Sequence, residues 1–199
     1  MGQLAEARGD LDGARTLFLA ADRALARLPG RPTAGDYVAI GTAYRHLGRE
    51  NSGYFRQALE AYDRALALDN GHHEARVLVG ELFLEKYNGP DAAASFREVL
   101  AVEPAHARAN LGMARHAVFD GTADPSPFLT KALETNPRLV PAIVLRARLL
   151  LDREDTEAAE REARKALEVN PTDSGALAVL AASQWLRGDA AFDRTRAMV

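Results

Sequence analysis

The chain has 199 residues, of which 47% are hydrophobic and 27% are charged, and its formal net charge is −3. This composition is that of a folded protein and argues against intrinsic disorder, and the small negative charge argues against nucleic acid as a partner. The chain has no cysteine, which excludes disulfides and thiolate metal ligands. It has no basic and apolar leader, and no segment long enough to insert into a membrane. We therefore expect a soluble, cytoplasmic protein or a fragment of one, without a cofactor.

Apolar residues recur at spacings of three and four along almost the whole chain, which predicts helices and no strands. Runs rich in Gly, Pro and Asn separate these helices. Asn70, Ser126 and Asp155 are candidate N-caps, because short polar side chains accept hydrogen bonds from the free amides of a first turn. In chain order, the predicted helices are 2–8, 11–28, 34–48, 54–69, 73–87, 90–102, 105–119, 126–136, 138–152, 156–169, 172–187 and 189–199.

Four of these helix ends recur at an almost fixed interval. Leu68-Asp69-Asn70, Val102-Glu103-Pro104, Thr135-Asn136-Pro137 and Val169-Asn170-Pro171 follow one another at spacings of 34, 33 and 34 residues. A period near 34 indicates a stack of helix pairs rather than a globular enzyme around one central pocket.

The residues between these ends repeat a pattern of small and aromatic positions. Tyr37, Ile40, Gly41 and Tyr44 have the spacing of the first helix of a tetratricopeptide repeat, and Ala58, Tyr62 and Ala65 that of the second. The chain therefore resembles the tetratricopeptide repeat family. The resemblance implies an all-α, right-handed superhelical solenoid of antiparallel helix pairs with five to six repeats. We expect a single domain over 1–199, with approximate units 1–33 (partial), 34–72, 73–104, 105–137, 138–171 and 172–199 (partial).

Small residues mark the places where the two helices of a pair are expected to approach closely. They are Gly41, Gly80, Gly112 and Ala147 in first helices and Ala58, Ala92 and Ala159 in second helices. Two places depart from the pattern. The segment 49–53 lengthens one turn, and Pro125 and Pro127 occupy the expected start of a second helix, which must begin late or be short.

In this family the first helices line a concave groove, so the resemblance implies a protein or peptide partner held there. The groove face recurs at i, i+4 and i+7, and Arg45 and Arg148 are candidate forked donors to a carboxylate. The small residues Ala109, Ala178 and Ala182 and Val144 complete the same stripe. The candidate groove residues are Val38, Thr42, Arg45, Val77, Glu81, Leu84, Met113, His116, Arg148, Leu151 and Trp185.

Other features favour binding over chemistry. The Lys and Asn residues with which some family members bind a C-terminal carboxylate are absent, because the matching positions hold Val38 with Thr42 and Val77 with Glu81. The histidines do not have a metal-ligand spacing, and no nucleotide or nucleophile motif occurs. We expect the paired acids Glu160 and Glu162 to lie on a solvent-exposed face. These patterns predict no catalytic and no metal-binding residue.

Trp185, the one tryptophan, is expected to pack against a following helix that is incomplete in this sequence, and the alternative is a binding anchor. An uncovered apolar face at each end of the stack would also allow end-to-end self-association.

The leading hypothesis for function is a non-catalytic scaffold for protein–protein interaction. One alternative is that this segment is the repeat region of a larger enzyme, such as a peptidase or transferase, whose catalytic domain lies outside it. RNA binding by a helical repeat of similar period would require a basic inner surface, which the net charge and the Val, Ala and Leu residues of the stripe argue against.

The two prolines at 125 and 127 predict that the seam around them is the weakest in the stack. We expect backbone amides in 120–130 to exchange with solvent faster than those in 90–102, because a shortened helix buries less apolar surface. Hydrogen exchange followed by mass spectrometry measures this difference. Equal protection of the two segments would contradict the prediction.

Overall fold

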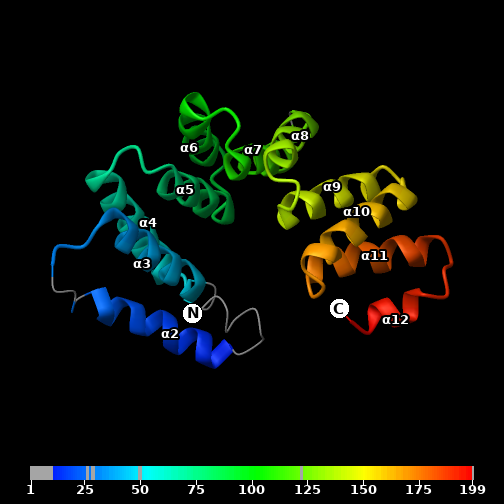
Figure 1. Ribbon diagram of the computed structural model, residues 1–199, viewed down its shortest axis with the longest axis horizontal. Helices are drawn as coiled ribbons and strands as arrows, with labels where there is room; N and C mark the ends of the chain where they lie inside the picture. Colours follow the sequence, from blue (N-terminus) through cyan, green and yellow to red (C-terminus); the bar gives the residue numbers. More distant parts are fainter. Residues whose placement is uncertain (1–10, 26, 28–29, 49–50, 122, 199) are drawn as a thin grey trace. The chain divides into compact units, whose positions relative to one another are not determined.

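The computed structural model describes residues 11–25, 27, 30–48, 51–121 and 123–198. The described residues are all-helical, as the apolar spacing predicts, and contain no strand (Figure 1). The helix predicted at 2–8 lies outside them. The chain divides into two compact units, residues 1–102 and 103–199, and the division falls between the repeats predicted for 73–104 and 105–137.

The first unit contains α2 (Leu11–Leu25), α3 (Ala34–Leu47), α4 (Gly53–Leu68), α5 (His73–Glu85) and α6 (Gly89–Val102). Helix α3 packs against α4, and α5 packs against α6, so each predicted pair forms. Helix α2 packs against α3, and α4 against α5, which continues the stack within the unit. We call α3, α5, α7, α9 and α11 the first helices and their successors the second helices.

The second unit contains α7 (Ala107–Asp120), α8 (Ser126–Thr135), α9 (Val140–Asp152), α10 (Thr156–Val169), α11 (Ser174–Leu186) and α12 (Phe192–Arg196). Its pairs are α7 with α8, α9 with α10 and α11 with α12. Helix α8 has 10 residues where α6 and α10 each have 14, which confirms that the second helix after Pro125 is short. Helix α12 is shorter than the predicted 189–199.

Glycine in the first helices makes room for an aromatic ring of the second helix. A Cβ atom on Gly41 would lie 2.4 Å from the Tyr62 ring, and one on Gly80 would lie 2.6 Å from the Phe96 ring. Tyr62 and Phe96 are fully buried, so neither ring has space to move away. The predicted close approach at these glycines is confirmed, and its cause is a ring seated on the glycine inside each pair.

The first helices can be aligned with one another by counting from the residue at which each helix begins. Ala75, Ala109, Ala142 and Ala176 are the third residues of α5, α7, α9 and α11, and all four are fully buried. Counting from the same starts, the eighth residues are Gly41, Gly80, Ala114, Ala147 and Ala181. The small contact residue of α7 is therefore Ala114, and the prediction of Gly112 for this position was wrong.

One of the three predicted N-caps is confirmed by the structure, and two are not. The Ala158 N–H donates to Asp155, which caps α10 as predicted. Asn70 and Ser126 were wrong predictions, because α5 is capped by His72, whose Nδ1 accepts from the Ala75 N–H, and Ser126 is already the first residue of α8. His106 caps α7 in the same way. The two histidine caps are equivalent in their repeats, and both bring a buried alanine into the first turn.

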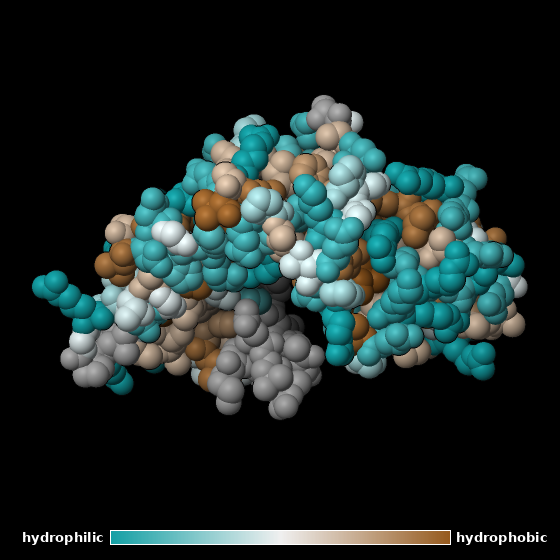
Figure 2. All heavy atoms as spheres, turned by 45° about the horizontal axis from the view of Figure 1, so that its top comes forward, coloured by the Kyte–Doolittle hydropathy of each residue, from teal (hydrophilic) through white to brown (hydrophobic). Residues whose placement is uncertain are grey.

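The surface is mostly hydrophilic on the face that Figure 2 presents, with separate hydrophobic patches. Exposed large apolar side chains among the described residues include Val118, Trp185 and Leu186 in the second unit. No helix in the described ranges combines the length and apolar character needed to cross a bilayer.

Replacing Gly80 by alanine tests the packing of a ring on a glycine. We expect Gly80→Ala to lower the free energy of unfolding by about 1–3 kcal/mol, because the added methyl group overlaps the buried Phe96 ring. Urea unfolding followed by circular dichroism measures the loss. Gly35→Ala is the matched control, since a Cβ atom there meets only ordinary contact with Thr33; a loss as large in the control would contradict the explanation.

Candidate functional site

The first helices of the second unit enclose a cleft of about 340 Å³. Three consecutive first helices contribute to it: α7, α9 and the beginning of α11. Its floor is apolar, and two guanidinium groups and one carboxylate stand at its walls. The lining residues are Arg115, Pro141, Val144, Leu145, Arg148, Asp173 and Gly175.

Arg148 is an exposed cation of this cleft. It makes no ion pair within the part of the chain that the structure describes. Its Nη2 atom lies 3.1 Å from the place that a Cβ atom on Gly175 would occupy. Because glycine has no side chain, the space beside Gly175 is open, and the Arg148 guanidinium lies there against the first turn of α11.

The carboxylate of the cleft is engaged within its own helix. Asp173 is the N-cap of α11, and its Oδ1 atom accepts a hydrogen bond of 2.9 Å from the Ala176 N–H. Arg148 and Asp173 thus lie beside Gly175 in the cleft with different roles. The cap fixes the first turn of α11, and Arg148 keeps its donors for another group.

Arg115 was not among the candidate groove residues, although it lines the cleft beside Arg148. Both are the ninth residue of their helix, counted from Ala107 and Val140. The prediction aligned α7 on Gly112 and therefore chose Ala109, Met113 and His116. Ala109 is fully buried, Met113 is only 8% exposed and His116 is half-buried, so the predicted face of α7 points largely into the core. The spacing of 33 residues between Pro104 and Pro137 is the signal that would have matched Arg115 to Arg148.

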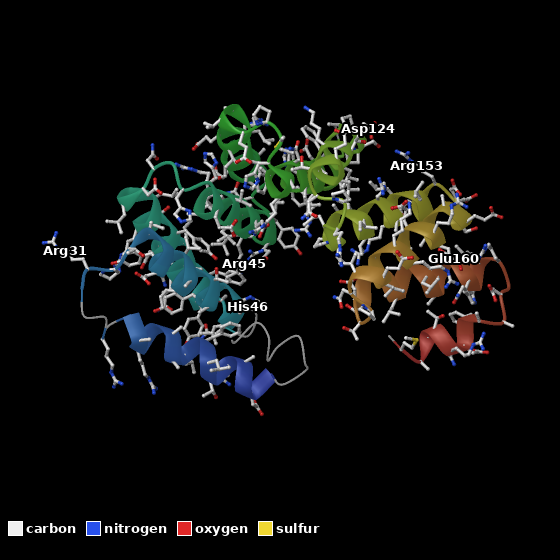
Figure 3. All side chains as sticks on the ribbon, in the orientation of Figure 1. Arg31, Arg45, His46, Asp124, Arg153 and Glu160 are labelled. Carbon is white, nitrogen blue, oxygen red and sulfur yellow. The ribbon has the colours of Figure 1, made fainter. Side chains whose placement is uncertain are left out.

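Arg45 was predicted to bind a ligand carboxylate, and in the structure it pairs with two carboxylates of its own chain. Its Nη1 lies 2.7 Å from Glu81, and its Nε donates to Glu85 at 2.9 Å (Figure 3). Burial alone would lower the pKa of Arg45, but the hydrogen bonds and charges of Glu85 and Glu81 raise it above its ordinary value. Arg45 and Glu81 thus tie α3 to α5, and each nitrogen of the Arg45 guanidinium already donates one hydrogen bond.

The remaining candidate groove residues differ in exposure. Val77 is fully buried, so its prediction as a surface contact was wrong: it supports α5 from inside the core. Val38, Thr42, Leu84 and Leu151 are half-buried. Trp185 is 64% exposed, and the five-residue α12 that follows it leaves most of its side chain uncovered.

Two other hollows have less to offer a ligand. One of about 430 Å³ is lined by the start of α4 and the residues just before it. Another, of about 350 Å³, includes Arg146 and Lys165, but both of these cations already pair with Glu162. No group of three or more His, Asp or Glu side chains placed to bind a metal occurs in the described ranges.

Residues 140–173, which form α9 and α10, match the model of the tetratricopeptide repeat. This segment contributes Arg148 and the apolar floor of the cleft, and its helix pair recurs through both units. Residues 140–173 are thus similar to a tetratricopeptide repeat.

Solved structures of low sequence identity share the fold. A thermophilic repeat protein of Thermus thermophilus is 18% identical over 83% of this chain and 88% of its own, with a TM-score of 0.69. The type IV pilus biogenesis factor PilW is 20% identical over 83% of this chain and 75% of its own, with a TM-score of 0.68. A chain of the APC/C hetero-tetramer Cut9–Hcn1 is 12% identical over 95% of this chain and 38% of its own, with a TM-score of 0.75. No curated protein matches the sequence.

Two glutamates of α10 that were expected to face solvent are buried. Glu160 and Glu162 on α10 are each only 9% exposed. Glu160 pairs with Arg164 and with Arg187 at the end of α11 (Figure 3). Glu162 accepts from Arg146 of α9 at 3.1 Å and from Lys165 at 2.7 Å. The expectation failed because cations from neighbouring helices neutralise both carboxylates and allow their burial.

Glu162→Gln tests the contribution of this pairing. Burial alone would raise the pKa of Glu162, but Lys165 and Arg146 lower it below its ordinary value. A lowered pKa in the folded state means that the stabilisation is complete above about pH 4.3 and is lost as the pH falls below that. We expect a loss of about 1–2 kcal/mol at pH 7, since the partners are partly exposed, and a much smaller loss at pH 3.

Urea unfolding at the two pH values measures this difference. Glu157→Gln is the matched control, because Glu157 lies on the same helix, is 73% exposed and is 4.0 Å from its partner Arg161. The control is expected to change stability by no more than a few tenths of a kcal/mol. A loss for Glu162→Gln that stays the same at both pH values would contradict the role of the charge.

Proposed function

We propose that this protein is a scaffold that binds an extended segment of another protein in the cleft between α7, α9 and α11. The observation that carries the proposal is the cleft itself. It combines an apolar floor with a few polar groups at its walls, and such a combination is typical of binding sites.

Further support comes from the rigidity of the cleft walls. Val144 is 7% exposed and belongs to the apolar core of the second unit. Asp173 fixes the first turn of α11 through its cap. A cleft whose walls are already ordered loses little conformational entropy on binding, which favours recognition of a flexible segment.

The fold comparisons agree with a binding role. One chain of similar fold belongs to the APC/C hetero-tetramer Cut9–Hcn1, an assembly of different proteins. No observation in the described ranges favours the alternative, in which this segment belongs to a larger enzyme whose catalytic domain lies outside it, and we assign no catalytic residue.

Selection of peptides from a random displayed library tests the proposal. We expect peptides selected on the protein to lose at least tenfold in affinity for Gly175→Leu, because the leucine side chain would occupy the space beside Val144 and Arg148. Ser174→Leu is the matched control, since Ser174 is exposed, adjacent and outside the cleft lining. Fluorescence anisotropy of labelled peptides measures both affinities.

A second measurement covers the case in which Gly175→Leu disturbs folding. Leu145 is replaced by the photoreactive p-benzoyl-phenylalanine and, as a control, so is the exposed Arg161 on α10. Selected peptides should cross-link from position 145 and not from position 161. Peptides that bind Gly175→Leu as well as the unchanged protein, or that cross-link equally from both positions, would move the binding site elsewhere.

A further inference from the structure

We infer that the segment bound in this cleft is an internal stretch of a partner protein in which acidic side chains stand next to apolar ones. Arg148 would bind a carboxylate at the first turn of α11, and Trp185 in the last turn of that helix would cover an apolar side chain further along the segment. This inference rests on the proposed function and adds to it the chemistry of the partner.

The charge of the cleft favours an acid. Its lining has two guanidinium groups and a single carboxylate, and that carboxylate already accepts the capping hydrogen bond from Ala176. The Asp173 carboxylate caps the first turn of α11, so the attraction for an incoming acid comes from the arginines. A guanidinium matches a carboxylate with two parallel N–H groups.

An apolar strip lies one helical turn from these arginines. Val118, Leu151 and Trp185 are the twelfth residues of α7, α9 and α11, three residues after Arg115, Arg148 and Ala182. Residues three apart share one face of a helix. Val118 is 45% exposed and Trp185 is 64% exposed, whereas Leu151 is half-buried. Side chains next to the bound acid would therefore meet apolar surface.

The length of the site favours an internal segment over a chain terminus. The cleft lining and the apolar strip draw on the same three first helices, so a bound chain has contacts available on both sides of Arg148. A terminal carboxylate would fill one end of this surface and leave the rest open. An acidic side chain lets the peptide continue in both directions, and we commit to that source of the carboxylate.

Trp185 supplies the measurement, because it is the one tryptophan of the sequence and is exposed. The probe is the synthetic peptide acetyl-SGLEEFLGS-amide, which contains no tryptophan. Its binding should shift the Trp185 emission to shorter wavelength as the indole is covered. Three matched peptides separate the contributions: acetyl-SGLQQFLGS-amide, which lacks the acids; acetyl-SGSEESSGS-amide, which lacks the apolar residues; and acetyl-SGLQQFLGS with a free terminal carboxylate.

We expect the probe to bind at least tenfold more tightly than the glutamine peptide, and more weakly as salt is added. Arg148→Gln should abolish the preference for the acidic peptide. Arg161→Gln, which removes an equally exposed arginine from α10 of the same unit, should leave the preference unchanged. The peptide without apolar residues should bind weakly and leave the Trp185 emission unchanged.

Three results would overturn the inference. They are no measurable binding of the probe, equal affinity for the acidic and glutamine peptides, or a free terminal carboxylate that restores binding to the level of the probe. None of these touches the proposed function, which fails only if library-selected peptides bind independently of Gly175 and position 145. The two proposals are therefore separable by experiment.

Discussion

The architecture depends on a small residue at the eighth position of every first helix. In α3 and α5 this residue is glycine, and the rings of Tyr62 and Phe96 occupy the space where a side chain would be. In α7, α9 and α11 it is Ala114, Ala147 or Ala181. Turning this position toward the partner helix fixes the rotation of the first helix about its own axis. The arginines of the cleft, one position further on, and the apolar strip, four positions further on, follow from that rotation.

This dependence explains which features of the fold could be predicted from the sequence alone. The period of 34, 33 and 34 residues, the helix pairs and the glycines at 41 and 80 could all be predicted, because each rests on local spacing. The face of α7 could not be predicted from Gly112, which imitates the small residue but lies two positions before Ala114. A shift of two residues turns a helix by about 200° and exchanges its inner and outer faces. This is why Arg115 was missed and Met113 was chosen.

Charged residues were the other limit, because their environment comes from helices distant in sequence. In the sequence, Arg45 and Arg148 are both cations at corresponding faces of a first helix, and nothing distinguishes them. In the structure Glu81 and Glu85, one turn apart on α5, take up the donors of Arg45, whereas Arg148 faces the bare backbone of Gly175. Likewise, nothing in the sequence of α10 indicates that Arg146 and Arg187 would reach Glu162 and Glu160. Side-chain length and helix packing decide such pairs, and periodicity does not encode them.

The ion pairs between helices also make the repeats non-interchangeable. Arg45 needs the acids of α5, and Glu160 needs the arginine at the end of α11, so each joint has charged partners that the other joints lack. A chain with two of its repeats exchanged would leave these buried charges without partners, at a cost of several kcal/mol. The order of the helix pairs along the chain is thus constrained by electrostatics as well as by packing.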